Sequence, residues 1–296
     1  MRGMSPPVQH DYGARIILGS MHGKERAIAR PFMRFLGAEV VPQPDLDTDA
    51  YGTYSAEIPR VGTMLETARA KAQAAMCLSG SLFGLASEGS YGPHPYLPFL
   101  PGGTELLVFI DDARKIEIVE TLIAPRTNFA SHACAAEDDV RGVLEGMGFP
   151  SHAVLVQPSM PEFRAAEWAR PLLFKGLSDA GAVRKAIAIC AAASKDAKAL
   201  IVTDLRAHLN PTRMAVIRMA AGRLARRVAS NCPVCGMPGF GIADIVRGLR
   251  CTDCGSPTRL PVATLFRCVA CSHSKRIPLK RTLSGADPAQ CDYCNP

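Results

Sequence analysis

Short apolar runs and longer stretches of helical periodicity alternate along the first part of the chain. Residues 14–18 have the pattern of a short buried strand, and a polar turn containing Lys24 separates them from residues 26–36, where apolar side chains recur at helical spacing. Residues 62–78 carry a narrow apolar stripe that suits packing on a sheet, and residues 82–86 form the next strand. This alternation predicts an α/β fold.

The same alternation returns further along the chain. Residues 153–157 and 199–202 have strand patterns, and residues 178–193 between them are helical. A strand, a helix and a strand at this spacing predict a right-handed crossover, which makes at least part of the sheet parallel. We therefore expect a mixed, partly parallel sheet flanked by helices.

Four C-x2-C pairs lie close to the C-terminal end. They are Cys232 and Cys235, Cys251 and Cys254, Cys268 and Cys271, and Cys291 and Cys294. Two thiolates in one tight turn bind one ion, and a second such turn completes the tetrahedral coordination of a structural zinc site. The spacing predicts two bound zinc ions in a double zinc-ribbon module, which would supply folding free energy that this Gly- and Pro-rich segment lacks.

The spacing of the cysteines is compatible with more than one way of combining the four pairs into two sites. Consecutive pairing is favoured because it closes the shorter loops. One alternative is interleaved pairing, in which the first and third pairs share an ion, and another is a site in which His273 replaces a cysteine. Gly236 and Gly255 directly follow two of the pairs, where a residue that reaches positive φ without strain is expected.

The length of 296 residues exceeds one typical domain. We place an α/β domain at residues 14–230, which ends with a long helix at 212–229, and the zinc-ribbon module at residues 231–296. Apolar runs near 18 residues are missing, so no membrane span is expected. Paired C-x2-C motifs without a secretory signal indicate a reducing, cytoplasmic location. The three remaining cysteines are expected to be small core residues. They are Cys77, Cys134 and Cys190.

Positive charge is concentrated toward the C-terminal end. From Arg206 onward there are fourteen Lys or Arg against four Asp, a balance of +10, which two four-thiolate zinc sites would lower to +6. A basic surface of this kind suits phosphate backbones. However, the aromatic residues of this region are isolated, whereas proteins that bind single strands need several stacking side chains. Nucleic acid is therefore a possible partner that the sequence does not favour.

Two groups of polar residues follow predicted strands. The turn after the first strand contains Ser20, His22 and Lys24 beside a helix start, an arrangement that suits a phosphate. Glu88 follows the strand at 82–86, at a carboxyl end where open α/β sheets bind ligands. An ordinary strand-to-helix connection with a solvated lysine is the alternative for the first turn.

The second group is Asp204, Arg206 and His208, after the strand at 199–202. Aspartate and histidine can transfer a proton, and arginine can bind an anionic oxygen. Capping and ion pairing at the junction with the zinc module are the alternative explanation. Both groups would line one crevice if their strands were neighbours.

One stretch resembles a known family. Glu66-Thr67-Ala68-Arg69-Ala70-Lys71-Ala72, followed by Leu85-Ala86-Ser87-Glu88-Gly89, resembles the E-N-A-x-x-K-A helix and L-A-D-D-S-G strand end of the inosine-triphosphatase and Maf superfamily. The turn Ser20-Met21-His22-Gly23-Lys24 is similar to the T-x-N-x-x-K phosphate turn of that superfamily. The complete chain also resembles a bacterial family of unknown function.

The superfamily resemblance implies hydrolysis of a nucleoside triphosphate to a monophosphate and pyrophosphate. It implies that Lys24 and Lys71 contact phosphates and that Glu66 and Glu88 hold Mg²⁺, which is all that such a reaction needs besides an oriented water. The alternative for these four residues is a salt-bridged helix face beside a capped strand. We therefore expect a metal-dependent hydrolase of a nucleotide-like phosphate. A nucleic-acid-associated zinc protein and a non-catalytic protein-interaction module are the other hypotheses.

Overall fold

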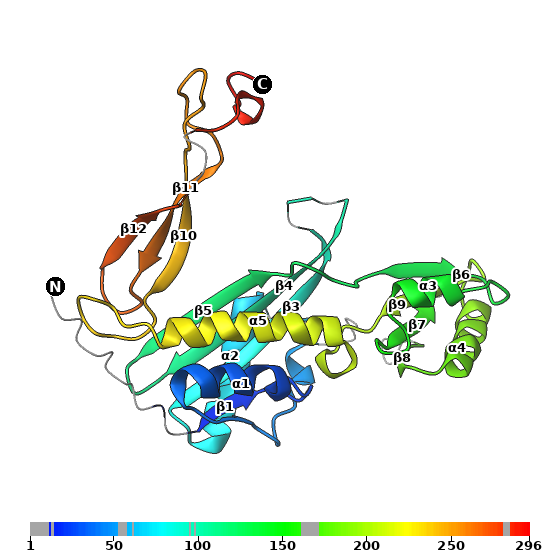
Figure 1. Cartoon of the computed structure of the whole chain (residues 1–296). Helices are drawn as coiled ribbons and strands as arrows, with labels where there is room; N and C mark the ends of the chain where they lie inside the picture. The colour runs from blue at the N-terminus through cyan, green and yellow to red at the C-terminus, as the bar shows by residue number, and fades with distance from the viewer. Residues whose placement is uncertain are drawn as a thin grey trace. The chain divides into compact units, whose positions relative to one another are not determined.

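A computed structural model describes residues 12, 15–52, 58–60, 62–94, 96–97, 99–160, 172–280 and 285–296 (Figure 1). The chain divides into two compact units. One extends from Tyr12 to Leu224, and the other includes Ala225 to Pro296. Within the described part of the chain, no helix is long and apolar enough to cross a membrane.

The first unit contains a five-stranded sheet in the order β2-β1-β3-β4-β5. The strands are β1 (Ile16–Gly19), β2 (Val40–Pro42), β3 (Phe83–Pro93), β4 (Pro101–Asp111) and β5 (Ile116–Ile123). β1 is parallel to both β2 and β3, whereas β3, β4 and β5 are antiparallel neighbours. The predicted mixed, partly parallel sheet flanked by helices is therefore confirmed.

Helices α1 (Glu25–Leu36) and α2 (Met64–Ser79) follow β1 and precede β3, and the short 3-10 helix η1 (Asp49–Tyr51) lies between them in sequence. The small side chains of Ala68, Ala72 and Ala75 let α2 pack closely on the sheet, as the apolar stripe predicted. Gly19 makes this approach possible, because a Cβ there would lie 2.5 Å from the backbone oxygen of Lys71.

A second, four-stranded sheet belongs to the same unit, in the order β6-β9-β7-β8. Its elements are β6 (Ser131–Cys134), α3 (Arg141–Gly146), β7 (Val154–Pro158), β8 (Phe174–Leu177), α4 (Ala180–Ala192) and β9 (Ala199–Thr203). All of its strand pairs are antiparallel. The predicted parallel crossover between β7 and β9 is therefore wrong, because β8 reverses the chain before α4 begins.

The apolar side chains of this second sheet pack against α4. Cys134 and Cys190 are fully buried in this core, as predicted, and burial raises the pKa of Cys190 to about 11. Cys77, in contrast, is exposed on α2. Helix α4 begins after Asp179, whose carboxylate accepts a hydrogen bond from the backbone nitrogen of Ala182. The predicted helical range, residues 178–193, therefore begins two residues before α4 does.

Helix α5 (Pro211–Val228) follows the 3-10 helix η2 (Ala207–Leu209). The side-chain oxygen of Asn210 accepts a hydrogen bond from the backbone nitrogen of Arg213 at 2.9 Å, which satisfies a donor in the first turn of α5. This cap fixes where α5 starts relative to β9. It therefore also fixes where the side chain of Arg213 projects.

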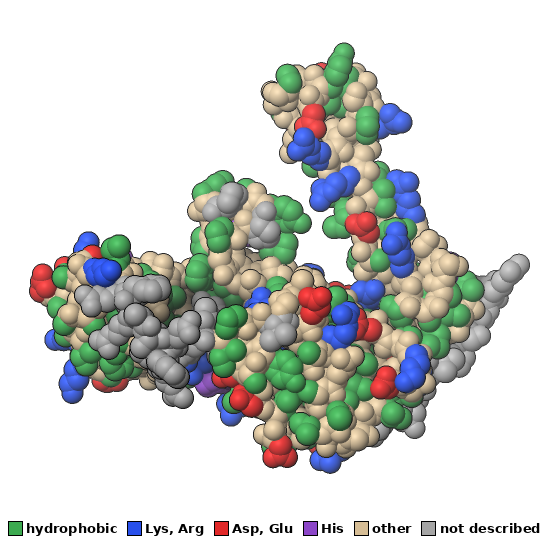
Figure 2. All heavy atoms as spheres, turned by 180° about the vertical axis from the view of Figure 1, so that it is seen from behind, with side chains coloured by type: hydrophobic (Ala, Val, Ile, Leu, Met, Phe, Trp, Pro, Cys, Tyr) green, Lys and Arg blue, Asp and Glu red, His purple; other side chains and the backbone are tan. Residues whose placement is uncertain are grey.

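The hairpin tip between β3 and β4 is apolar and exposed (Figure 2). Tyr96 and Phe99 are 70% and 80% exposed, and Leu97 and Leu100 lie beside them in sequence. Exposed apolar patches are typical of contact surfaces.

The second unit contains a three-stranded antiparallel sheet, β10-β11-β12. The strands are β10 (Gly241–Arg247), β11 (Pro261–Arg267) and β12 (Ser274–Pro278), and the 3-10 helix η3 (Pro288–Gln290) follows them. Gly241 pairs with Arg267, and Arg247 pairs with Pro261. The start of β10 therefore lies at the same end of the ribbon as the end of β11.

Candidate functional site

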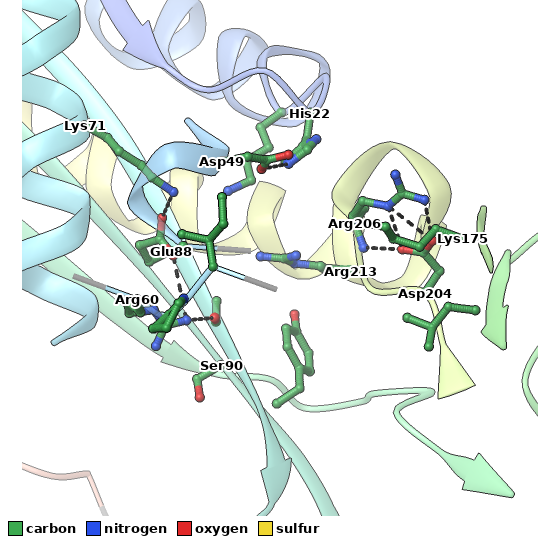
Figure 3. A pocket seen from close by; sticks show the side chains of 17 residues that line it. His22, Asp49, Arg60, Lys71, Glu88, Ser90, Lys175, Asp204, Arg206 and Arg213 are labelled. Carbon is green, nitrogen blue, oxygen red and sulfur yellow. Dashed lines mark hydrogen bonds and ion pairs between the residues drawn. The ribbon is translucent and has the colours of Figure 1, made fainter. Parts of the chain in front are cut away.

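A pocket of about 300 Å³ opens in the first unit, where β3 continues beyond the end of β1 (Figure 3). Gly19, the last residue of β1, pairs with Ala86, so Ser87 and Glu88 extend past it. Residues that follow β9 line the same pocket. Six cationic side chains line it, namely Lys24, Arg60, Lys71, Lys175, Arg206 and Arg213, against the three carboxylates Asp49, Glu88 and Asp204.

Lys24 is the central cation of this pocket. It lies directly before α1, is buried, and donates a hydrogen bond from Nζ to the backbone oxygen of Ser87 at 2.9 Å. Among the described residues, no carboxylate oxygen lies within 4.0 Å of this Nζ. Burial, together with a smaller effect of the nearby Arg213, lowers the pKa of Lys24 to about 8. An unpaired buried ammonium is unfavourable unless an anion joins it.

Glu88 connects two other cations. Lys71, from α2, donates to Oε1 of Glu88 at 2.5 Å, and both side chains are about nine-tenths buried. Arg60 donates to the backbone oxygen of Gly89 at 2.8 Å, and its Nη2 lies 3.8 Å from Oε2 of Glu88. The structure therefore brings together Lys24, Lys71 and Glu88, three of the four residues for which the superfamily resemblance implies a role.

Arg213 and Glu105 form a buried ion pair behind the pocket. Nε of Arg213 donates to Oε1 of Glu105 at 2.6 Å, and Nη1 donates to the backbone oxygen of Leu205. Tyr91 also donates to Oε1 of Glu105 at 2.6 Å, and the guanidinium of Arg213 lies over the Tyr91 ring. Sequence reasoning missed this cluster. Its signal was Glu105 itself, a charge directly before five apolar residues of β4.

Asp204 and Arg206 reach the pocket from the second sheet. Arg206 donates to both oxygens of Asp204 through Nε and Nη2, at distances between 2.7 and 3.2 Å. The backbone nitrogen of Gly176 donates to Asp204 at 3.0 Å. Burial alone would raise the pKa of the Asp204 carboxyl, but the hydrogen bonds from Arg206 outweigh burial and lower it. The guanidinium is therefore held in one orientation.

His22 lies at another side of the pocket. Its Nε2 is 3.1 Å from Oδ1 of Asp49, and its ring stacks on that of His208 with 5.4 Å between the ring centroids. Burial lowers the pKa of His22, and Asp49 opposes part of this effect. Ser20 is buried, and its Oγ accepts a hydrogen bond from the backbone nitrogen of His22 at 3.5 Å. His208 thus contacts His22 instead of lining the pocket itself.

The structure does not bring Glu66 to this site. Its carboxylate accepts a hydrogen bond from the backbone nitrogen of Thr63 at 2.7 Å, and Thr63 Oγ1 accepts one from the backbone nitrogen of Glu66. This is the capping box of α2, which the spacing T-x-x-E already indicates. Glu66 and Glu88 therefore do not form a shared Mg²⁺ site. Apart from the cysteines, no cluster of three metal-ligating side chains occurs in the described ranges.

The eight cysteines of the second unit form two groups of four that can each hold a metal ion. One group is Cys232, Cys235, Cys268 and Cys271, and the other is Cys251, Cys254, Cys291 and Cys294. Sulfur atoms from different pairs lie 3.6 to 3.8 Å apart. Four sulfurs at about 2.3 Å from one central zinc ion are about 3.8 Å from each other, whereas disulfide sulfurs are about 2.05 Å apart. The donor set and its spacing therefore fit tetrahedral metal.

The pairing is interleaved, so the favoured consecutive pairing is wrong. The first pair precedes β10 and the third follows β11, and antiparallel pairing of these strands places both at one end of the ribbon. The second and fourth pairs meet at the other end. A seven-residue strand separates the ends by roughly 20 Å, which prevents consecutive pairs from sharing an ion.

The glycines that follow two of the cysteine pairs have the backbone conformation that the sequence predicts. Gly236 and Gly255 have φ values of +72° and +71°, as expected. Their backbone nitrogens donate to the carbonyl oxygens of Cys232 and Cys251. His273 belongs to neither group of ligands, and its ring stacks on Phe240 with 5.5 Å between the centroids.

Comparison with known proteins identifies the family of the chain. A model of a domain of unknown function, DUF6671, matches residues 71–296. This region includes Lys71, Glu88, Asp204 and all eight cysteine ligands, and it begins after Lys24. The comparisons do not support the expected relationship with the inosine-triphosphatase and Maf superfamily, and neither the curated proteins nor the solved structures gave a match. Because the match covers most of the chain, the protein belongs to the DUF6671 family.

Proposed function

We propose that the unit from Tyr12 to Leu224 binds a small phosphate-bearing molecule in its pocket. The proposal is based on Lys24, which is a buried cation without a carboxylate partner among the described residues. The other well-buried cations each have such a partner. Lys71 pairs with Glu88, and Arg213 pairs with Glu105. A bound anion would supply the charge that Lys24 lacks.

Phosphate suits this pocket in charge and in size. Six cations face three carboxylates, and a phosphate group accepts several charge-assisted hydrogen bonds at once. The volume of about 300 Å³ is at the lower end for small-molecule pockets, which favours a ligand of the size of a mononucleotide or a sugar phosphate.

We further propose that the pocket hydrolyses the bound phosphate ester. His22, held by Asp49, is the side chain of the pocket best suited to accept a proton from water, because its lowered pKa keeps the ring neutral near pH 7. The pocket offers more cations than carboxylates. Lysine and arginine side chains would therefore neutralise the charge that Mg²⁺ neutralises in many phosphoryl-transfer enzymes.

Thermal unfolding with and without anions tests the binding proposal. Orthophosphate and a nucleoside monophosphate should raise the melting temperature of the wild-type chain in a concentration-dependent way, because both bind only the folded state. Lys24→Met should abolish the shift. Lys185→Met, which removes an exposed lysine of α4, should leave it unchanged. If neither anion shifts the wild-type transition, the binding proposal is wrong.

A panel of nucleotides and phosphate esters tests hydrolysis through release of phosphate or pyrophosphate. His22→Asn should remove turnover but leave the phosphate-induced thermal shift in place. Equal turnover by this variant and the wild-type chain would exclude His22 as the proton acceptor. Binding without turnover of any compound would limit the proposal to its binding part.

We also propose that the two cysteine groups hold zinc, and that this metal stabilises the ribbon. A four-thiolate site is closed and has no position for a substrate, so its role is structural. Metal analysis of the purified chain should give two zinc ions per chain, and removal by a chelator should unfold the ribbon without unfolding the first unit. A chelated chain with an intact ribbon would contradict this role.

Charge does not favour nucleic-acid binding by this ribbon. Residues 232–296 contain eight Lys or Arg and four Asp. Two four-thiolate zinc sites, at −2 each, cancel the remaining +4. Much of the positive balance counted from Arg206 onward therefore comes from the arginines of α5 and its N-terminal flank.

A further inference from the structure

Two buried lysines line the pocket, and their amines are held differently. Nζ of Lys71 donates to Oε1 of Glu88 at 2.5 Å. Nζ of Lys24 donates to the backbone oxygen of Ser87 at 2.9 Å, and among the described residues no carboxylate oxygen lies within 4.0 Å of it. Of the two, only Lys24 can therefore lose its proton without breaking an ion pair.

The surroundings of Lys24 favour the neutral amine. Burial lowers its pKa to about 8, with smaller contributions of the same sign from Arg213 and Lys71. The carboxylates of Glu88 and Glu105 act in the opposite direction and offset only part of this effect. At pH 7 about one Lys24 side chain in ten is neutral, which is about 300 times the neutral fraction of an ordinary lysine.

The neutral amine of Lys24 has the setting of a nucleophile. Desolvated lysines beside other cations form Schiff bases with carbonyl compounds in several enzymes. The side chain is buried in the fold, yet it lines the pocket of about 300 Å³, so a small ligand in the pocket reaches it. The carbonyl of Ser87 accepts a hydrogen from Nζ and does not occupy the lone pair of the nitrogen.

We infer that Lys24 forms an imine with the carbonyl group of a small phosphorylated aldehyde or ketone bound in the pocket. The inference rests on the proposed phosphate binding and adds a carbonyl group to the ligand. It does not depend on the proposed hydrolysis. The small volume of the pocket favours a short carbon chain between the carbonyl and the phosphate.

The reaction needs no partner besides the ligand and a proton. Nζ attacks the carbonyl carbon, an N–C bond forms, and the electron pair of the C=O double bond moves to oxygen. One proton passes from nitrogen to that oxygen, and a second, from solvent, lets the oxygen leave as water while the lone pair of nitrogen forms the C=N bond. His22 lines the same pocket, with Asp49 against its ring, and can carry these protons. The iminium product keeps a positive charge beside the phosphate.

Reductive trapping on the full chain tests this inference. Glycolaldehyde phosphate with sodium cyanoborohydride at pH 7 converts the iminium to a stable secondary amine, and peptide mapping by mass spectrometry locates the adduct. Lys24 should be modified about tenfold faster or more than the exposed Lys185. Lys71 is the control within the pocket, because Glu88 holds its amine, and it should stay unmodified.

Two competition experiments test whether the phosphate guides the reaction. Orthophosphate should slow the modification of Lys24, because it occupies the same pocket. Glycolaldehyde without the phosphate should modify Lys24 about tenfold more slowly, because it lacks the group that binds. Both experiments use the wild-type chain, so they do not depend on the folding of a variant.

Variants complete the test. Lys24→Met should lose the adduct at position 24 without creating one elsewhere, and Lys185→Met should retain the Lys24 adduct. An orthophosphate-induced thermal shift without an adduct at Lys24 would overturn the inference and leave the proposed phosphate binding intact, as would equal rates at Lys24 and Lys185. A wild-type chain without that thermal shift would instead refute the proposed phosphate binding, and with it the phosphorylated ligand.

Discussion

Replacing Lys24 with methionine should stabilise the protein while it removes phosphate binding. The pKa of the buried Lys24 is about 8, compared with 10.5 for an ordinary lysine. At about 1.4 kcal/mol for each pKa unit, holding the protonated side chain in the folded state costs about 3 kcal/mol at pH 7. The hydrogen bond to Ser87 offsets about 1 kcal/mol of this cost. Lys24→Met should therefore raise the free energy of unfolding by about 2 kcal/mol.

The stability advantage of Lys24→Met over the wild-type chain should decrease as pH rises above about 8. Between pH 8 and 10.5 the folded wild-type chain has lost the Lys24 proton while the unfolded chain still holds it, so the wild-type chain gains stability as pH rises. The advantage of the methionine variant is complete below about pH 8 and should shrink by about 2 kcal/mol between pH 7 and pH 10. Below pH 8 both states of the wild-type chain are protonated, and the difference stays constant.

Urea unfolding of both chains at pH 7 and pH 10 measures this difference directly, because groups that titrate equally in the two chains cancel. Lys185→Met, on the exposed face of α4, should show no comparable dependence on pH. A Lys24→Met chain that is less stable than wild type at pH 7, or a difference that is the same at both pH values, would refute the reasoning.

Three further predictions concern other parts of the chain. The double variant Cys235→Ser with Cys268→Ser should retain one metal ion, because both cysteines belong to the same site. The double variant Cys235→Ser with Cys254→Ser should retain none, because it removes one ligand from each site. Metal analysis that gives the reverse result would exclude the interleaved pairing. Glu66→Ala should lower the free energy of unfolding by about 1 kcal/mol through loss of the helix cap, and a large accompanying loss of phosphate affinity would contradict its purely structural role. Gly19→Ala should lower the free energy of unfolding by about 2 kcal/mol or more, because the added Cβ meets a backbone oxygen of α2 at 2.5 Å. Thermal or urea unfolding measures this loss, and a variant as stable as wild type would show that α2 shifts freely.

Local patterns in the sequence identified several features that the structure shows. The apolar stripe of α2 predicted its packing on a sheet. The apolar run before Glu88 predicted a strand, but β3 continues through Glu88 to Pro93 instead of ending before it. Spacing alone predicted the positive φ of Gly236 and Gly255. Each of these features depends on residues within a few positions of one another, so a linear pattern contains the necessary information.

Features that depend on pairing between distant segments were not predicted. The metal pairing follows from the antiparallel register of β10 and β11, and periodicity does not encode register. No sequence pattern assigned a role to Asp49, which lines the pocket because the loop after β2 brings it to His22. Glu66 is a different case. The T-x-x-E spacing already indicated that its carboxylate caps α2, whereas the family resemblance assigned the same carboxylate to Mg²⁺.

Interleaving of the cysteine pairs also constrains how the ribbon is made on the ribosome. When the nascent chain has emerged as far as β11, four cysteines are outside, yet they belong to two different sites and no complete cage exists. The first cage closes only after Cys271 appears, and the second requires Cys294. A fragment produced by proteolysis between Cys254 and β11 would likewise carry half of each cage and would release both ions.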